Sequence, residues 1–105
     1  MEDEVMYKTI LQKLTNGQNM TEEDVRNIIN AINNDELTEG QISGFLVALV
    51  MKGTTLEETA AFAKAMRNVC VPLSPQVQTE MMDTCGTGGG LSTYNISTAT
   101  AIVAA

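Results

Sequence analysis

The stretch DELTEGQISGFLVALVMKG, residues 35–53, predicts a helix with clear signals at both ends. Thr38 can cap the first turn, and Gln41 stands three residues later, where it completes a capping box. Gly53 follows the last periodic residues and is a typical end of a helix. The chain therefore has at least one well-delimited helix, around which the rest can be assigned.

Apolar residues cover nearly the whole circumference of this helix. One face consists of Ile42, Phe45, Leu46, Leu49 and Val50, and the other is mostly filled by Val47, Ala48 and Met51. A helix that is apolar nearly all round is covered on every side, and in a small domain the cover is often a partner chain. Gly44 lowers the helix propensity by about 1 kcal/mol, which is tolerable if another backbone approaches closely there.

Three further helices are predicted around this one. The first runs over about residues 4–14 and carries one apolar stripe. The second begins at Thr21, with Asp24 in the capping-box position. The last begins at Thr54 or Thr55, with acidic residues in its first turn, where the helix dipole favours them. Four short helices with short connections predict a compact helical domain.

The helical pattern stops at two prolines. Pro72 and Pro75 predict a hinge over residues 71–79, between a helical domain of residues 1–70 and a second unit of residues 80–105. In the second unit, a short strand is predicted just before a glycine-rich loop, and a helix just after it. Strand, glycine-rich loop and helix form the layout of a phosphate-binding βα unit.

The composition limits the possible functions. The net charge of the 105-residue chain is -7, which argues against nucleic acid or an anionic membrane surface as the main partner. The longest apolar run, residues 45–51, is too short to cross a bilayer, and the acidic N-terminus lacks the layout of a signal peptide, so a cytoplasmic protein is expected.

The chain has no histidine, which excludes Ser-His and Cys-His catalysis within it. Cys70 and Cys85 are predicted to be small apolar filler.

The loop region DTCGTGGGLSTYNIST, residues 83–98, contains four glycines within five positions and no Lys or Arg. It matches neither G-x-G-x-x-G nor a P-loop, because Leu91 stands where both patterns need glycine. Glycines that expose backbone N–H groups, followed by a helix N-terminus, nevertheless favour an anion over a plain capped turn. The missing positive charge would come from Mg²⁺ bound to the ligand or from residues elsewhere.

This region resembles the phosphoribosyl diphosphate loop of the anthranilate phosphoribosyltransferase family, which carries D-x-x-G-T-G-G-D, a short spacer and N-x-S-T. Residues 83–89 and 95–98 match these motifs, and residues 35–53 are similar to the family's helical domain. The resemblance implies a transferase of tryptophan biosynthesis, in which the amine of anthranilate attacks C1 of 5-phosphoribosyl diphosphate and diphosphate leaves with Mg²⁺. It also implies a homodimer formed through the helical domain.

The resemblance assigns binding roles but no catalytic residue to this chain. The residues implied in binding phosphoribosyl diphosphate are Gly86, Gly89, Thr93, Asn95, Ser97 and Thr98. Gly86 would also adjoin the anthranilate site, and Ser97 would also bind Mg²⁺. Asp83 would orient the loop.

The sequence departs from the family pattern at two points. The family has Asp after GTGG, whereas Gly90 stands here and the spacing is one residue shorter, which predicts weaker binding of substrate and metal. The chain also stops at Ala105, before the family's Lys- and Arg-bearing segments and most of its parallel sheet. The expected fold is therefore mostly α: a four-helix domain followed by the first strand, glycine loop and helix start of a truncated α/β domain. Such a chain is expected to be inactive alone.

Two other functions fit parts of the pattern. The chain could be a helical dimerisation or interaction module with a vestigial phosphate loop, as the nearly all-apolar helix favours. It could also be a relative of the pyrimidine nucleoside phosphorylases, which share the helical domain. The N-x-S-T motif at residues 95–98 argues against the phosphorylase.

Overall fold

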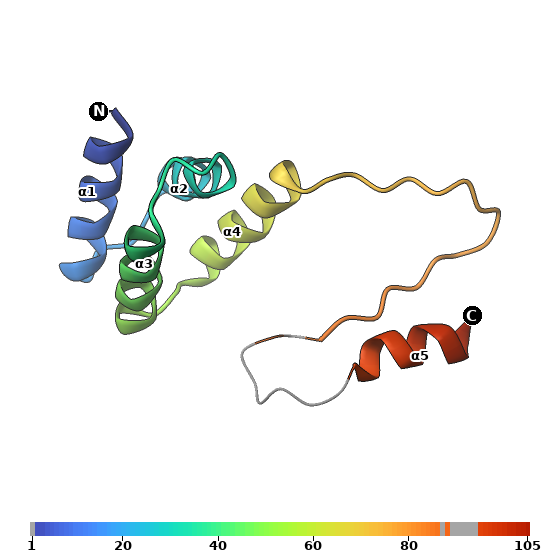
Figure 1. Ribbon diagram of the computed structural model, residues 1–105. Helices are drawn as coiled ribbons and strands as arrows, with labels where there is room; N and C mark the ends of the chain where they lie inside the picture. Colours follow the sequence, from blue (N-terminus) through green and yellow to red (C-terminus); the bar gives the residue numbers. More distant parts are fainter. Residues whose placement is uncertain (1, 87, 89–94) are drawn as a thin grey trace. The chain divides into compact units, whose positions relative to one another are not determined.

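The computed structural model describes residues 2–86, 88 and 95–105, and these contain five helices (Figure 1). They are α1 (Glu2–Thr15), α2 (Glu22–Asn33), α3 (Glu39–Lys52), α4 (Leu56–Val69) and α5 (Ile96–Ala104). The chain separates into two units, Met1–Pro72 with the first four helices and Leu73–Ala105 with the fifth. Among the described helices, none combines the length and the apolar character that crossing a membrane requires.

Threonine caps begin α2, α3 and α4. The hydroxyl of Thr21 accepts a hydrogen bond from the Asp24 N–H, and the Asp24 carboxylate accepts one from the Thr21 N–H. Thr38 and Gln41 form the same reciprocal pair at the start of α3. Both predicted capping boxes are confirmed, and Thr55 is the cap of α4. Each such cap stabilises a helix by about 1 kcal/mol, so the helix starts are set by local sequence.

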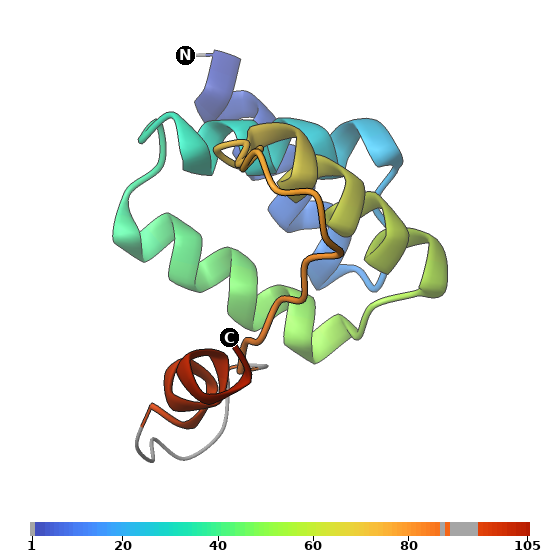
Figure 2. The same ribbon diagram turned by 90° about the vertical axis from the view of Figure 1, so that its right-hand side faces the viewer.

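The core of the first unit lies between the four helices. Its buried apolar residues are Tyr7, Ile10, Leu14, Met20, Val25, Ile28, Ala31, Leu37, Phe45 and Ala65. In Figures 1 and 2, α2 lies against α4, the most extensive helix pair, and α1 packs against both α2 and α3. The Phe45 and Phe62 rings lie 6.4 Å apart between centroids, which joins α3 to α4. The apolar stripes predicted for these helices therefore face the core.

The helix α3 is covered on one side only within the part of the chain that the structure describes. Phe45 is its one buried residue, whereas the opposite face is open to solvent. The exposed fractions there are 50% for Leu46, 64% for Val47, 80% for Val50 and 82% for Met51. No helix of the first unit packs against this outer face, so the prediction that the helix is covered on every side, with a partner chain as the cover, stays a prediction.

A close contact at Gly44 explains the glycine in the middle of α3. A β-carbon at this position would lie 3.2 Å from the Tyr7 hydroxyl oxygen. That hydroxyl donates a hydrogen bond of 2.9 Å to the carbonyl oxygen of Gln41. The predicted neighbour was another backbone, but the neighbour is a tyrosine side chain from α1.

Over its described residues, the second unit consists of segments without regular structure and the helix α5. The strand predicted over residues 81–85 is absent from the described residues, which show no pairing partner for it. A strand needs the hydrogen bonds of a neighbouring strand to be stable, and none is present there. The predicted helix is confirmed: α5 begins after Asn95, and Ile102 and Val103 are 74% and 85% exposed.

We predict that Gly44→Ala and Tyr7→Phe are not additive in stability. In the wild-type background the new methyl group must displace the tyrosine hydroxyl, which offsets the gain of about 1 kcal/mol in helix propensity. In the Tyr7→Phe background the obstruction is gone, so Gly44→Ala should be more favourable by about 1 kcal/mol. Urea unfolding of the four proteins measures this coupling, and purely additive effects would show that the contact does not constrain the glycine.

Candidate functional site

The described part of the glycine loop contains one residue in a left-handed backbone conformation. Gly88 has a φ of 72°, a left-handed conformation that side-chain-bearing residues rarely adopt. Gly86 is exposed with open space around it. Two of the predicted binding residues, Gly89 and Thr93, lie outside the described residues, as does the position of the family's missing Asp beside Gly90.

Three predicted binding residues lie together at the N-terminus of α5. Asn95 occupies the N-cap position, and Ser97 and Thr98 follow in the first turn. The side chain of Asn95 makes no capping hydrogen bond, in contrast to the three threonine caps. The first backbone N–H groups of a helix have no partner within it and carry partial positive charge. This end of α5 therefore presents amide and hydroxyl donors of the kind that bind an anion.

A hydrogen bond joins the segment before the loop to the helix after it. The Thr84 hydroxyl donates to the carbonyl oxygen of Ser97 over 3.0 Å, and both residues are half-buried. Thr84 was not predicted as part of the site. Its position directly after Asp83 was the only signal in the sequence, and hydroxyls beside a turn are common.

The charged side chains near the loop do not attract an anion, because all of them are acidic. Arg67 is the last basic residue of the chain, and Glu80 and Asp83 are the only charged side chains after it. In the part that the structure describes, no three acidic or cysteine side chains come together as a metal site would require. The loop thus offers hydrogen-bond donors and single oxygen ligands, without a cation of its own.

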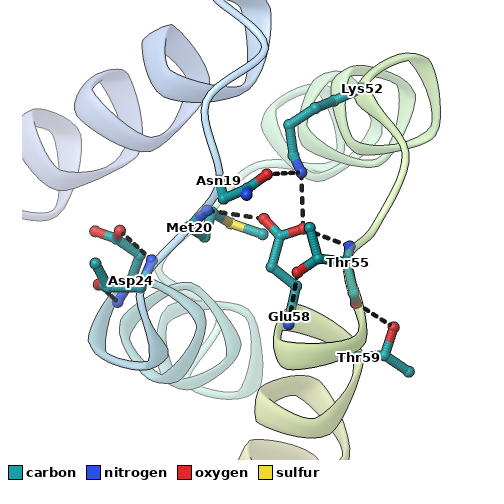
Figure 3. Close-up of polar contacts among 8 residues, drawn as sticks. Asn19, Met20, Asp24, Lys52, Thr55, Glu58 and Thr59 are labelled. Atoms are coloured by element: carbon teal, nitrogen blue, oxygen red, sulfur yellow. Dashed lines mark hydrogen bonds and ion pairs between the residues drawn. The ribbon is translucent and has the colours of Figure 1, made fainter.

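A second polar centre lies in the first unit, around the buried carboxylate of Glu58 (Figure 3). Its side chain is 1% exposed and accepts hydrogen bonds from the Met20 N–H at 2.8 Å and the Thr55 N–H at 2.9 Å. The Lys52 ammonium lies 2.7 Å away, is 4% exposed, and also donates to Asn19. These contacts join the loop before α2, the end of α3 and the start of α4.

The comparisons with known proteins decide the family. The sequence profile of the "Glycosyl transferase family, helical bundle domain" matches residues 8–70, which is more than half of the chain. The chain belongs to this family. Residues 8–70 are therefore its bundle domain, and they contain the whole buried cluster of Glu58, the C-terminal part of α1, and all of α2, α3 and α4.

Several relatives match the bundle domain and the loop together. Proteins named anthranilate phosphoribosyltransferase from Petrotoga mobilis, Acetivibrio thermocellus and Solibacter usitatus are 45%, 44% and 42% identical over 95%, 95% and 90% of this chain. The chain spans 28–29% of the length of these relatives. No solved structure matches it. The resemblance inferred from the glycine loop is confirmed.

Glu58 in the bundle domain stays ionised although it is buried. Burial raises the pKa of its carboxyl, but the hydrogen bonds from Lys52, Thr55 and Met20 lower it by more, so the pKa lies below its ordinary value. Asp24 behaves in the same way, because its Lys13 partner and the capping hydrogen bonds outweigh its burial and lower its pKa. Both carboxylates are therefore stabilised in the folded chain relative to the unfolded chain.

We predict an acid-dependent loss of stability that Glu58→Gln reduces. A lowered folded pKa stabilises the fold above the unfolded pKa of about 4.3, and this contribution is lost as the pH falls through the folded pKa. At pH 7, Glu58→Gln should lower the free energy of unfolding by about 3 kcal/mol, because Lys52 is left buried without its counter-charge. Urea unfolding between pH 7 and pH 3 should show a shallower pH dependence for Glu58→Gln, with Asp24 supplying part of the remainder.

The neighbouring Glu57→Gln is the matched control, since Glu57 is exposed. It should leave both the stability at pH 7 and the pH dependence close to those of the wild type. Equal pH dependence in Glu58→Gln and the wild type would show that the buried carboxylate does not titrate with unfolding.

Proposed function

We propose that the chain is the N-terminal part of an anthranilate phosphoribosyltransferase, which joins anthranilate to 5-phosphoribosyl diphosphate in tryptophan biosynthesis and releases diphosphate. The observation that carries this proposal is the 42–45% identity to proteins of that name, which extends over 90–95% of the chain. It thus includes the bundle domain and most or all of the second unit. The donors gathered at the start of α5 are consistent with a phosphate ligand.

In this proposal the loop and the first turn of α5 hold phosphoribosyl diphosphate. The backbone of Gly89 would bind its diphosphate, the side chains of Asn95, Ser97 and Thr98 would bind its phosphate oxygens, and Thr93 would also contact it. Gly86, where no side chain intrudes, adjoins the place where anthranilate meets the ribosyl carbon. These residues position the two substrates, which is the larger part of catalysis when the attacking amine is a weak nucleophile and the leaving group is already good.

Mg²⁺ fits this arrangement as a companion of the substrate. Ser97 offers a hydroxyl, an oxygen ligand of the kind that Mg²⁺ accepts, and the ion commonly keeps waters and phosphate oxygens as its other ligands. One hydroxyl is too little to hold the ion alone, so its other ligands would be substrate oxygens and waters. When bound, the ion would supply positive charge that stabilises the departing diphosphate.

The second unit is proposed to be the start of an α/β domain over residues 80–105, joined by a hinge over residues 71–79. Two observations support this. The relatives extend well past the length of this chain, and the apolar residues of α5 are exposed in the described structure. With neighbouring strands present, residues 81–85 would have the hydrogen-bond partners that a strand needs. The remaining Lys and Arg of the site would come from that larger domain.

The exposed face of α3 supports a second, compatible function, which is self-association. An open groove of about 800 Å³ lies between α1 and α3, lined by Leu11, Leu14, Gly44, Val47, Ala48 and Met51 among others. The sequence of α3 has no charged residue between Glu39 and Lys52. Depletion of charge in an apolar patch marks the centre of an interface. A homodimer with two-fold symmetry could place the protruding Val47 and Met51 of each chain in the groove of the other.

We predict that the full reading frame containing this chain converts anthranilate and 5-phosphoribosyl diphosphate in the presence of Mg²⁺. Ser97→Ala should lower kcat/KM for phosphoribosyl diphosphate by about 10- to 100-fold, the effect of a lost hydrogen bond to a charged group. Thr100→Ala is the matched control, because that hydroxyl donates to the Ile96 carbonyl within the same helix. Loss of anthranilate fluorescence follows the reaction, and phosphorolysis of pyrimidine nucleosides in its place would refute the proposal.

Measurements on the isolated 105-residue chain test whether basic residues outside it are needed to bind the substrate. Isothermal titration with phosphoribosyl diphosphate and Mg²⁺ should show binding weaker than about 1 mM, or none, because no basic residue follows Arg67. Turnover should be undetectable. Robust turnover would show that residues outside this chain are not needed.

We predict that Met51→Glu disrupts a dimer without unfolding the helices. Met51 is 82% exposed in the single chain, so a charge there costs little in the monomer but much in an apolar interface. Sedimentation equilibrium should show an increase in the dimer dissociation constant of about 30-fold or more. Met66→Glu, at an exposed position of α4, is the control and should leave association unchanged. A wild-type chain that stays monomeric at high concentration would exclude self-association through this face.

A further inference from the structure

We draw no further inference here: the strongest candidate, the apolar groove between α1 and α3, belongs to the self-association surface already proposed, and nothing in the described residues shows that any other partner covers it.

Discussion

The buried carboxylate of Glu58 is the interaction on which the arrangement of the bundle domain depends. It accepts hydrogen bonds from a loop, a helix cap and a lysine side chain, which come from three separate segments. Apolar contacts are tolerant of small shifts, whereas a charge in a dry environment must keep all its partners. The start of α4 is therefore held in one position relative to the end of α3 and the loop that precedes α2. The apolar residues between α2 and α4 then pack together with the start of α4 already held in place by the Glu58 carboxylate.

Local sequence was sufficient to predict the helices and their starts. The threonines at positions 21 and 38 cap the helices predicted for them, because each capping box needs only residues within four positions of one another. What depends on distant residues could not be predicted in this way. The neighbour of Gly44 is Tyr7, which lies far away in sequence, and among the helices of the first unit none covers the outer face of α3. Glu58 lies three residues after Thr55, which is the spacing of a capping box and can be seen in the sequence. Its hydrogen bond to Met20 forms only in the folded chain, so the sequence does not predict it.

In the candidate site, too, features that depend on neighbouring residues were predicted and features that depend on distant residues were not. The helix start at residues 95–98 was predicted from its motif and is observed, because the start of a helix depends mainly on residues close in sequence. The strand before the loop was predicted from its residue types and is not formed, because strand pairing is a property of the sheet. Thr84 was missed, since its bond to the Ser97 carbonyl spans the loop and leaves no pattern in the sequence. The glycine motif thus identifies the family better than it describes the local geometry.

The tie between Met20 and Glu58 also bears on the order in which the chain acquires structure during synthesis. The two residues are 38 positions apart, and the other core contacts of the bundle domain lie within the first unit, Met1–Pro72. Helical domains, in which most contacts are local, are nevertheless among the fast folders. Because a ribosome adds roughly 5–20 residues per second, the domain can close as soon as α4 has left the exit tunnel. A growing chain would then carry a folded bundle domain before the second unit, Leu73–Ala105, has left the tunnel.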